Sequence, residues 1–290
     1  SSPPQAASDA TDPTATPAPA AAPPPPPPDL VISPAPDTTP EKPMDPYWHD
    51  PDNGLQLYCG DMREILPALG ITADCMIVDP PYAETALEWD RWPDGWPQLA
   101  ATATSSMWCF GSMRMFLDRA PEFADWKLSQ DVVWEKHNGT GFAADRFKRV
   151  HEIATHWYRG NWSAVHHDTP HTPYSGPDKH ARARYNDRAA HAGAIKAVTY
   201  VDNGTRLARS VQKQPSVRGG LHPTEKPLPL LRMLISYACP PGGLVLDPFA
   251  GSGSTLDAAR QSGRRAIGIE AREDYCEAAK RRLSALTLPA

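Results

Sequence analysis

The residues of this chain with the most evident chemical potential lie together in DPPY, at Asp79 to Tyr82. An apolar run, Cys75 to Val78, leads directly into an aspartate, two prolines and a tyrosine. A helix cannot begin there, because proline lacks the amide donor and disfavours a helical residue before it. We therefore expect a strand to bring a carboxylate, a stiff turn and an aromatic ring to one place.

A second cluster lies in GGLVLDPFAGSGST, residues 242–255. An apolar strand is expected to end at Asp247, and Gly251 and Gly253 then allow the backbone to approach a ligand closely. The helix that follows would aim free amide groups at that ligand. The next strand is expected to end at Glu270, where a carboxylate can bind a ribose diol. This unit predicts a nucleoside-binding site.

The same residues restrict which nucleoside is bound. A dinucleotide fingerprint has a third glycine where this chain has Leu256. The carboxylate of Asp247 would repel a pyrophosphate, whereas it could hold an ammonium group. A ligand with a ribose and an amino-acid ammonium but no phosphate is S-adenosylmethionine, which we expect as the cofactor.

Both clusters need a sheet to position them. Short apolar runs alternate with helical patterns, which is typical of an α/β fold with a parallel sheet and crossover helices. Strands are expected at residues 55–59, 75–79, 105–110, 131–136, 152–158, 244–247 and 265–270. Helices are expected at residues 61–69, 96–104, 112–119, 227–239, 253–262 and 272–285.

The chain divides by composition into three kinds of segment. Residues 1–43 are rich in proline and alanine and have no aromatic residue, so we expect a disordered linker. Residues 44–290 are expected to form one domain. Within it, residues 160–218 are polar and rich in Gly, Pro, His and Arg, which predicts an inserted, loop-dominated module.

Charge is distributed unevenly along the chain. The formal net charge is −5, but residues 137–218 carry +7 while residues 44–136 carry −10. The basic block is open to two interpretations: a solvated insertion, or a surface that contacts phosphates.

Other classes of protein are not favoured. No apolar stretch is long enough to span a membrane, and the N-terminal residues lack the pattern of a signal peptide. The five cysteines are scattered without a CxxC pair, so we expect free thiols in a reducing cytoplasm and no metal site.

In this order, DPPY at 79–82, HPTEKP at 222–227 and DPFAGSGST at 247–255 resemble the amino-methylating DNA methyltransferases, which modify adenine N6 or cytosine N4. The order resembles the β-group of that family. The resemblance implies a class I, Rossmann-like methyltransferase fold with a seven-stranded, mostly parallel sheet and a circularly permuted motif order. Residues 160–218 would then be the target-recognition insertion.

The resemblance also implies roles for individual residues. The catalytic residues would be Asp79, Pro80, Pro81 and Tyr82. The cofactor would contact Asp247, Pro248, Phe249, Ala250, Gly251, Ser252, Gly253, Thr255 and Glu270, with Thr224 and Lys226 near its carboxylate and Asp61 near its adenine. Phosphates of double-stranded DNA would contact Arg146, Lys148, Arg149, Arg182, Arg184 and Arg188. His151 and Glu152 match a family segment, but we do not include them in catalysis.

The expected reaction is methylation of a flipped-out adenine at N6. Asp79 and the carbonyl of Pro80 would accept the two amine hydrogens and so free the nitrogen lone pair, while Tyr82 would stack on the base. Aspartate at position 79 favours adenine.

N4-cytosine, a protein glutamine or an RNA amine are the alternative substrates, and a DNA-binding module without catalysis is the alternative to an enzyme. A restriction endonuclease partner and the choice between monomer and homodimer remain open.

Overall fold

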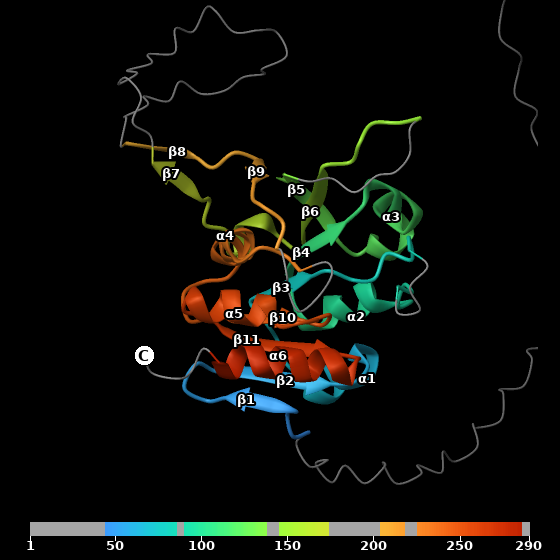
Figure 1. Ribbon diagram of the computed structural model, residues 1–290, viewed down its shortest axis with the longest axis vertical. Helices are drawn as coiled ribbons and strands as arrows, with labels where there is room; N and C mark the ends of the chain where they lie inside the picture. Colours follow the sequence, from blue (N-terminus) through green and yellow to red (C-terminus); the bar gives the residue numbers. More distant parts are fainter. Residues whose placement is uncertain (1–43, 86–89, 138–144, 174–203, 218–224, 286–290) are drawn as a thin grey trace, which may run out of the picture. The chain divides into compact units, whose positions relative to one another are not determined.

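The computed structural model describes residues 44–85, 90–137, 145–173, 204–217 and 225–285 (Figure 1). Their main element is a nine-stranded sheet in the order β1-β2-β11-β10-β3-β4-β6-β5-β9. A second sheet pairs β7 with β8. Among the described residues no helix is long and apolar enough to cross a membrane.

The centre of the large sheet is parallel. Strand β2 pairs with β11, β11 with β10, β10 with β3 and β3 with β4, all in parallel, while β6 runs antiparallel to both β4 and β5. The bounds are β1 Trp48–Asp50, β2 Leu55–Cys59, β3 Cys75–Val78, β4 Ser106–Gly111, β5 Lys127–Glu135, β6 His151–Tyr158, β7 His171–Pro173, β8 Thr205–Leu207, β9 Val211–Lys213, β10 Leu244–Asp247 and β11 Arg265–Glu270.

Helices cover both faces of this sheet because side chains alternate along each strand. In β3, Cys75 and Ile77 belong to one core cluster with α4, α5 and α6, whereas Met76 and Val78 belong to a second cluster with α1 and α2. Figure 1 shows α4, α5 and α6, the orange to red helices, along the sheet. The bounds are α1 Met62–Leu69, α2 Trp96–Ala103, α3 Met113–Asp118, α4 Leu228–Ala238, α5 Ser254–Gln261 and α6 Glu273–Ala285, with short 3-10 turns at η1 Ala120–Phe123 and η2 Trp162–Ala164.

All seven expected strands and all six expected helices form, and most bounds agree within one residue. The largest difference is β5, which begins at Lys127, because its first residues pair with β6 although they are exposed. Two short strands widen the expected seven-stranded sheet to nine: β1 pairs with β2, and β9 pairs with β5. Strand β9 lies within the expected insertion, residues 160–218. Residues 174–203 and 218 of this insertion, and the expected linker 1–43, lie outside the described residues.

The permuted order brings distant segments together at the centre of the sheet. Strand β10, late in the sequence, pairs with β3, and Val245 lies opposite Cys75. The carboxyl ends of β3, β10 and β11 therefore open at one edge, where α/β sheets bind ligands. Helix α5 packs closely on this part of the sheet because residue 268 of β11 is a glycine. A Cβ at Gly268 would lie only 2.7 Å from the side chain of Leu256 on α5.

Candidate active site

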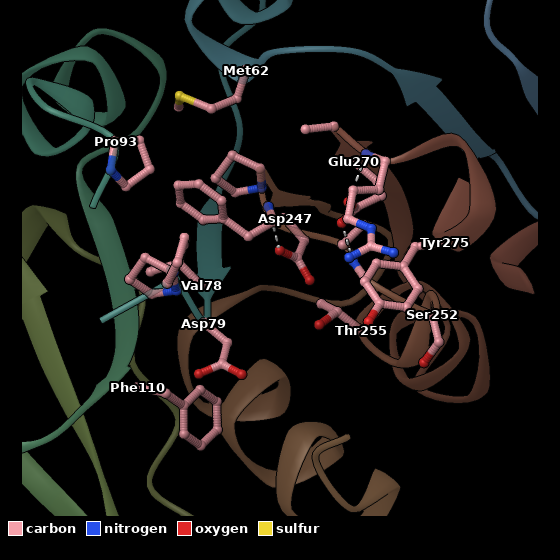
Figure 2. Close-up of a pocket in the computed structure, with 18 of the residues that line it drawn as sticks. Met62, Val78, Asp79, Pro93, Phe110, Asp247, Ser252, Thr255, Glu270 and Tyr275 are labelled. Carbon is pink, nitrogen blue, oxygen red and sulfur yellow. Dashed lines mark hydrogen bonds between the residues drawn. The ribbon is translucent and has the colours of Figure 1, made fainter. Parts of the chain in front are cut away.

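A cavity of about 520 Å³ lies at the carboxyl ends of β2, β3, β10 and β11. Asp79 follows β3, Asp247 ends β10 and Glu270 ends β11. All three line this cavity, and Figure 2 shows the side chains of Asp79 and Asp247 directed into the same space. The structure therefore brings together the two sequence clusters, which are more than 150 residues apart in the chain.

The DPPY turn holds its aspartate by a hydrogen bond from its own tyrosine. The hydroxyl of Tyr82 donates to Oδ1 of Asp79 at 2.5 Å. Burial raises the pKa of the Tyr82 hydroxyl well above its ordinary value, and the charges of Asp79 and Glu152 raise it further. The tyrosine therefore stays a neutral donor. Pro80 and Pro81 also line the cavity.

Asp90 fixes the backbone that leaves this turn. Its carboxylate accepts the amide hydrogens of Ala83, Glu84 and Thr85 at 2.8, 3.0 and 2.7 Å. Ala83 has a φ of 58°, which is unfavourable for a residue with a side chain. Sequence reasoning did not identify Asp90; an aspartate soon after the DPPY turn is a signal, but it does not say which amides the carboxylate would meet.

Lys226 provides the second contact to the carboxylate of Asp79. Its ammonium bonds Oδ2 of Asp79, lies 3.4 Å from Oε2 of Glu152 and stands 4.9 Å from the ring centroid of Phe110. Burial disfavours the charged amine, but Asp79 and Glu152 outweigh burial and raise the pKa of Lys226 above its ordinary value. Its expected contact with the cofactor carboxylate stays a prediction, and Thr224 lies outside the described residues.

Glu152 is a cavity-lining residue that sequence reasoning left out of catalysis. Besides Lys226 it contacts Lys136, which follows β5. Burial by itself raises the pKa of the Glu152 carboxyl, but Lys226 and Lys136 outweigh burial and lower it. Two signals for Glu152 were present in the sequence: its match to a family segment, and its position as a charged residue at the start of the expected strand EIATHWY.

Asp247 is a buried carboxylate without a cation of its own among its described contacts. It accepts the amide hydrogen of Phe249 at 3.0 Å and the hydroxyl of Thr255. Burial raises the pKa of Asp247 to about 7, and the charges of Asp79 and Glu270 add to this rise. A positive group on a ligand would relieve that cost, so the site favours an ammonium here.

Glu270 closes the other side of the glycine turn. Its oxygens accept the amide hydrogens of Gly251 at 2.8 Å and Arg272 at 2.9 Å. Burial raises the pKa of its carboxyl. Each oxygen keeps a second acceptor position, which could receive the hydroxyl of a ribose.

The glycine turn itself depends on two backbone conformations. Gly251 and Gly253 have φ values of 50° and 77°, which glycine adopts without strain. A Cβ at Gly253 would also lie 3.1 Å from that of Ala279 on α6. Gly253 does not line the cavity, whereas the other described residues expected at the cofactor all do, namely Asp61, Lys226, Asp247, Pro248, Phe249, Ala250, Gly251, Ser252, Thr255 and Glu270.

Asp61 and its neighbours form the wall beside β2. Its side chain caps α1 by accepting the amide hydrogen of Arg63 at 2.8 Å, and it pairs with the Arg63 guanidinium at 2.5 Å. This capping contact leaves Asp61 and Arg63 at the cavity wall, where the resemblance puts the cofactor adenine.

The expected phosphate-contacting residues are described only in part. Arg146, Lys148 and Arg149 are exposed in the segment before β6, and Arg149 lies 3.9 Å from Glu84, which is close to the DPPY turn. Arg146 pairs with Asp145 at 2.8 Å. The remaining candidates, Arg182, Arg184 and Arg188, lie outside the described residues. No group of three or more His, Cys, Asp or Glu in the described part of the chain could hold a metal ion.

Comparison with known sequences gives relatives of this chain. Over 108 residues it is 44% identical to the Escherichia coli (strain K12) protein YubD, an alignment that covers 35% of this chain and 48% of that protein. The type II methyltransferase M.ScaI of Streptomyces caespitosus is 27% identical over 270 residues, which cover 83% of this chain and 84% of the relative.

Comparison with solved structures shows the same fold. The crystal structure of an M1.HpyAVI–SAM complex matches 79% of this chain and 98% of its own, with a TM-score of 0.56 and 24% identity. The PvuII DNA methyltransferase, described as cytosine-N4-specific, matches 81% of this chain and 88% of its own, with a TM-score of 0.54 and 16% identity.

The family comparison covers most of the chain. The family model N6_N4_Mtase, described as DNA methylase, matches residues 73–281. This range includes the DPPY turn, the cavity-lining Glu152 and Lys226, and the whole glycine turn. The chain therefore belongs to the N6/N4 DNA methylase family.

Proposed function

We propose that this protein transfers a methyl group from S-adenosylmethionine to the N6 amino group of an adenine in double-stranded DNA. The observation that carries the proposal is the shared cavity, in which Asp79 of the DPPY turn lies with Asp247 and Glu270 of the glycine turn. The DPPY turn suits the amine of a nucleobase, and the carboxylates of the glycine turn suit a cationic nucleoside.

The acceptor groups of the cavity fit the cofactor. Asp247, buried and costly to ionise alone, suits the cofactor's ammonium, and Glu270 suits the ribose hydroxyls. A cavity of about 520 Å³ is within the usual size of small-ligand sites, roughly 300–1,000 Å³. When bound, S-adenosylmethionine supplies an electrophilic methyl group on its sulfonium.

The chain's own residues would prepare the amine. Its lone pair is delocalised into the base, so two acceptors at fixed angles are needed to localise it on nitrogen. Asp79 and the Pro80 carbonyl would accept the two N–H hydrogens. Because Tyr82 and Lys226 bond opposite oxygens of Asp79, the carboxylate would meet the amine in one orientation, as preorganised catalysis requires. Stacking of the Tyr82 ring on the base stays part of the proposal.

The ground for adenine rather than cytosine is the aspartate at position 79, since family members that use cytosine more often carry serine there. Fold does not favour either base, because the PvuII enzyme is described as cytosine-N4-specific. The purified protein should be incubated with S-adenosylmethionine and duplex DNA, and the DNA digested to nucleosides for mass spectrometry. We expect N6-methyladenine.

Two outcomes would change this proposal. N4-methylcytosine as the sole product would replace adenine by cytosine. Transfer to RNA or to protein glutamine that exceeds transfer to duplex DNA, measured side by side with a labelled methyl group, would overturn DNA as the substrate. An Asp79→Ala variant is the control, and it should lose methyl transfer while it still binds S-adenosylmethionine.

A further inference from the structure

Four side chains of alternating charge form a continuous series, and three of them, Asp79, Lys226 and Glu152, line the cavity. Lys226 contacts Asp79 and Glu152, and Glu152 also contacts Lys136. Lys136 stands 4.6 Å from the ring centroid of Trp134, the residue opposite Glu152 in the β5–β6 pairing. The series thus connects the DPPY turn to the adjoining ends of β6 and β5.

The inner cation depends on more than one anion. Only 6% of the Lys226 side chain is exposed, and a buried ammonium tends to lose its proton. Asp79 and Glu152 together overcome that tendency. The proposed reaction requires Asp79 to contact the target amine as well, so Glu152 is the anion that can serve Lys226 throughout.

The catalytic carboxylate in turn depends on Lys226. Tyr82 bonds Oδ1 of Asp79 and Lys226 bonds Oδ2. The terminal torsion of an aspartate side chain has a broad energy well, so partners on both oxygens are what restrict it. If Lys226 became neutral or moved away, Asp79 could turn and would present its acceptor to the amine at the wrong angle.

We propose that Glu152 is a positioning residue for methyl transfer. It keeps Lys226 charged and in contact with Asp79, and thereby holds the carboxylate in the orientation that receives the target amine. This inference rests on the proposed function, because it requires Asp79 to be the acceptor of that amine.

Several elements place titratable or charged groups around Lys226 and Glu152, and all of these groups bear on the pH dependence. Asp79 and Tyr82 come from the DPPY turn, Glu152 from β6 and Lys136 from the end of β5. Asp247 ends β10, and the charge of Asp79 raises its pKa. Strand β4 contributes the Phe110 ring and the thiol of Cys109, which is buried near Asp79. Of these groups, Lys226 is the buried cation that loses a neighbouring anion when Glu152 is neutralised.

The test is the pH profile of kcat for Glu152→Gln. Loss of one anion lowers the pKa of the still-buried Lys226, so its proton is lost as pH rises through the lowered value. We expect kcat to fall at least about tenfold near neutral pH, the scale of losing a supporting partner, and to fall further toward about pH 10. The wild-type profile should stay flat on that alkaline side, because the pKa of its Lys226 is raised above the ordinary value of a lysine.

Three further variants make the result specific. Glu152→Asp keeps the charge and should restore much of kcat and the flat alkaline profile. Glu135→Gln is the matched control, since Glu135 pairs with Lys213 outside the cavity at 3.2 Å, and it should behave as wild type. The double variant Glu152→Gln with Lys136→Met removes the unpaired outer cation, so it should regain thermal stability but keep the low kcat and the alkaline fall.

The outcomes separate this inference from the proposed function. A Glu152→Gln enzyme with wild-type kcat and a flat alkaline profile overturns the inference. So does a loss of kcat that keeps the wild-type pH profile and disappears when the double variant regains stability, since that is a purely structural effect. If instead the wild-type protein transfers no methyl group to duplex DNA, the proposed function itself fails. Methyl transfer retained by Asp79→Ala would overturn the role of Asp79 as acceptor, and this inference with it, but not the proposed function.

Discussion

At the scale of single residues, Asp247 is the group whose environment most directly predicts a measurable effect. Its pKa is raised to about 7, first by burial and then by Asp79 and Glu270. A cation can pair with Asp247 only when the carboxyl is ionised. In the free protein, the carboxyl is protonated below about pH 7, and cofactor binding must then displace that proton.

We therefore predict that affinity for S-adenosylmethionine falls as pH drops below about 7, toward about tenfold per pH unit, and levels off above it. Calorimetric titration between about pH 5.5 and about pH 8.5 would measure this. The Asp247→Asn variant lacks the titrating group, so it should bind weakly and with little pH dependence. A wild-type affinity that is constant over this range would show that Asp247 does not pair with the ammonium.

At the scale of elements, the approach of α5 to the sheet depends on Gly268. A Cβ there would meet Leu256 of α5 at 2.7 Å and the Cβ of Ala250 at 3.0 Å. Both neighbours are buried, and Ala250 lies in the turn that forms the cavity. A methyl group on this residue must therefore displace the helix and the glycine turn together.

We predict that Gly268→Ala lowers the free energy of unfolding by about 1–3 kcal/mol and weakens S-adenosylmethionine binding. Urea unfolding and calorimetric titration would measure the two effects. Shortening Leu256 to Ala in the same chain makes room for the methyl group, so the double variant should lose less than the sum of the two single losses. Additive losses would mean that the two side chains do not compete for this space.

At the scale of the whole molecule, the uneven charge predicts how DNA binds. The chain is acidic overall, but residues 137–218 carry a net charge of +7. Docking this block on DNA should release counterions, so we predict that Kd for duplex DNA rises at least about tenfold between about 50 mM and about 200 mM salt. Fluorescence anisotropy would measure it, and a Kd insensitive to salt would remove the basic block from the interface.

The sequence by itself determined the local elements and the identity of the two central clusters. Apolar runs before Asp79 and Asp247 predicted β3 and β10, because periodicity and chain-breaking residues act over a few neighbours. The glycines at 251 and 253 predicted the turn, since their positive φ values belong to the local backbone. Resemblance then assigned the family, which the family comparison confirms.

Only the tertiary structure decided what those clusters touch. It placed Lys226 in contact with Asp79 and brought Glu152 into the cavity. It directed three backbone N–H groups to the carboxylate of Asp90. It also added β1 and β9 to the sheet, as strands too short for periodicity to reveal. The physical reason is that the pairing of a side chain depends on its neighbours in space. Asp79 and Lys226 are 147 positions apart in the chain, and it is the packing of α4, which begins two residues after Lys226, against β3 that brings them into contact.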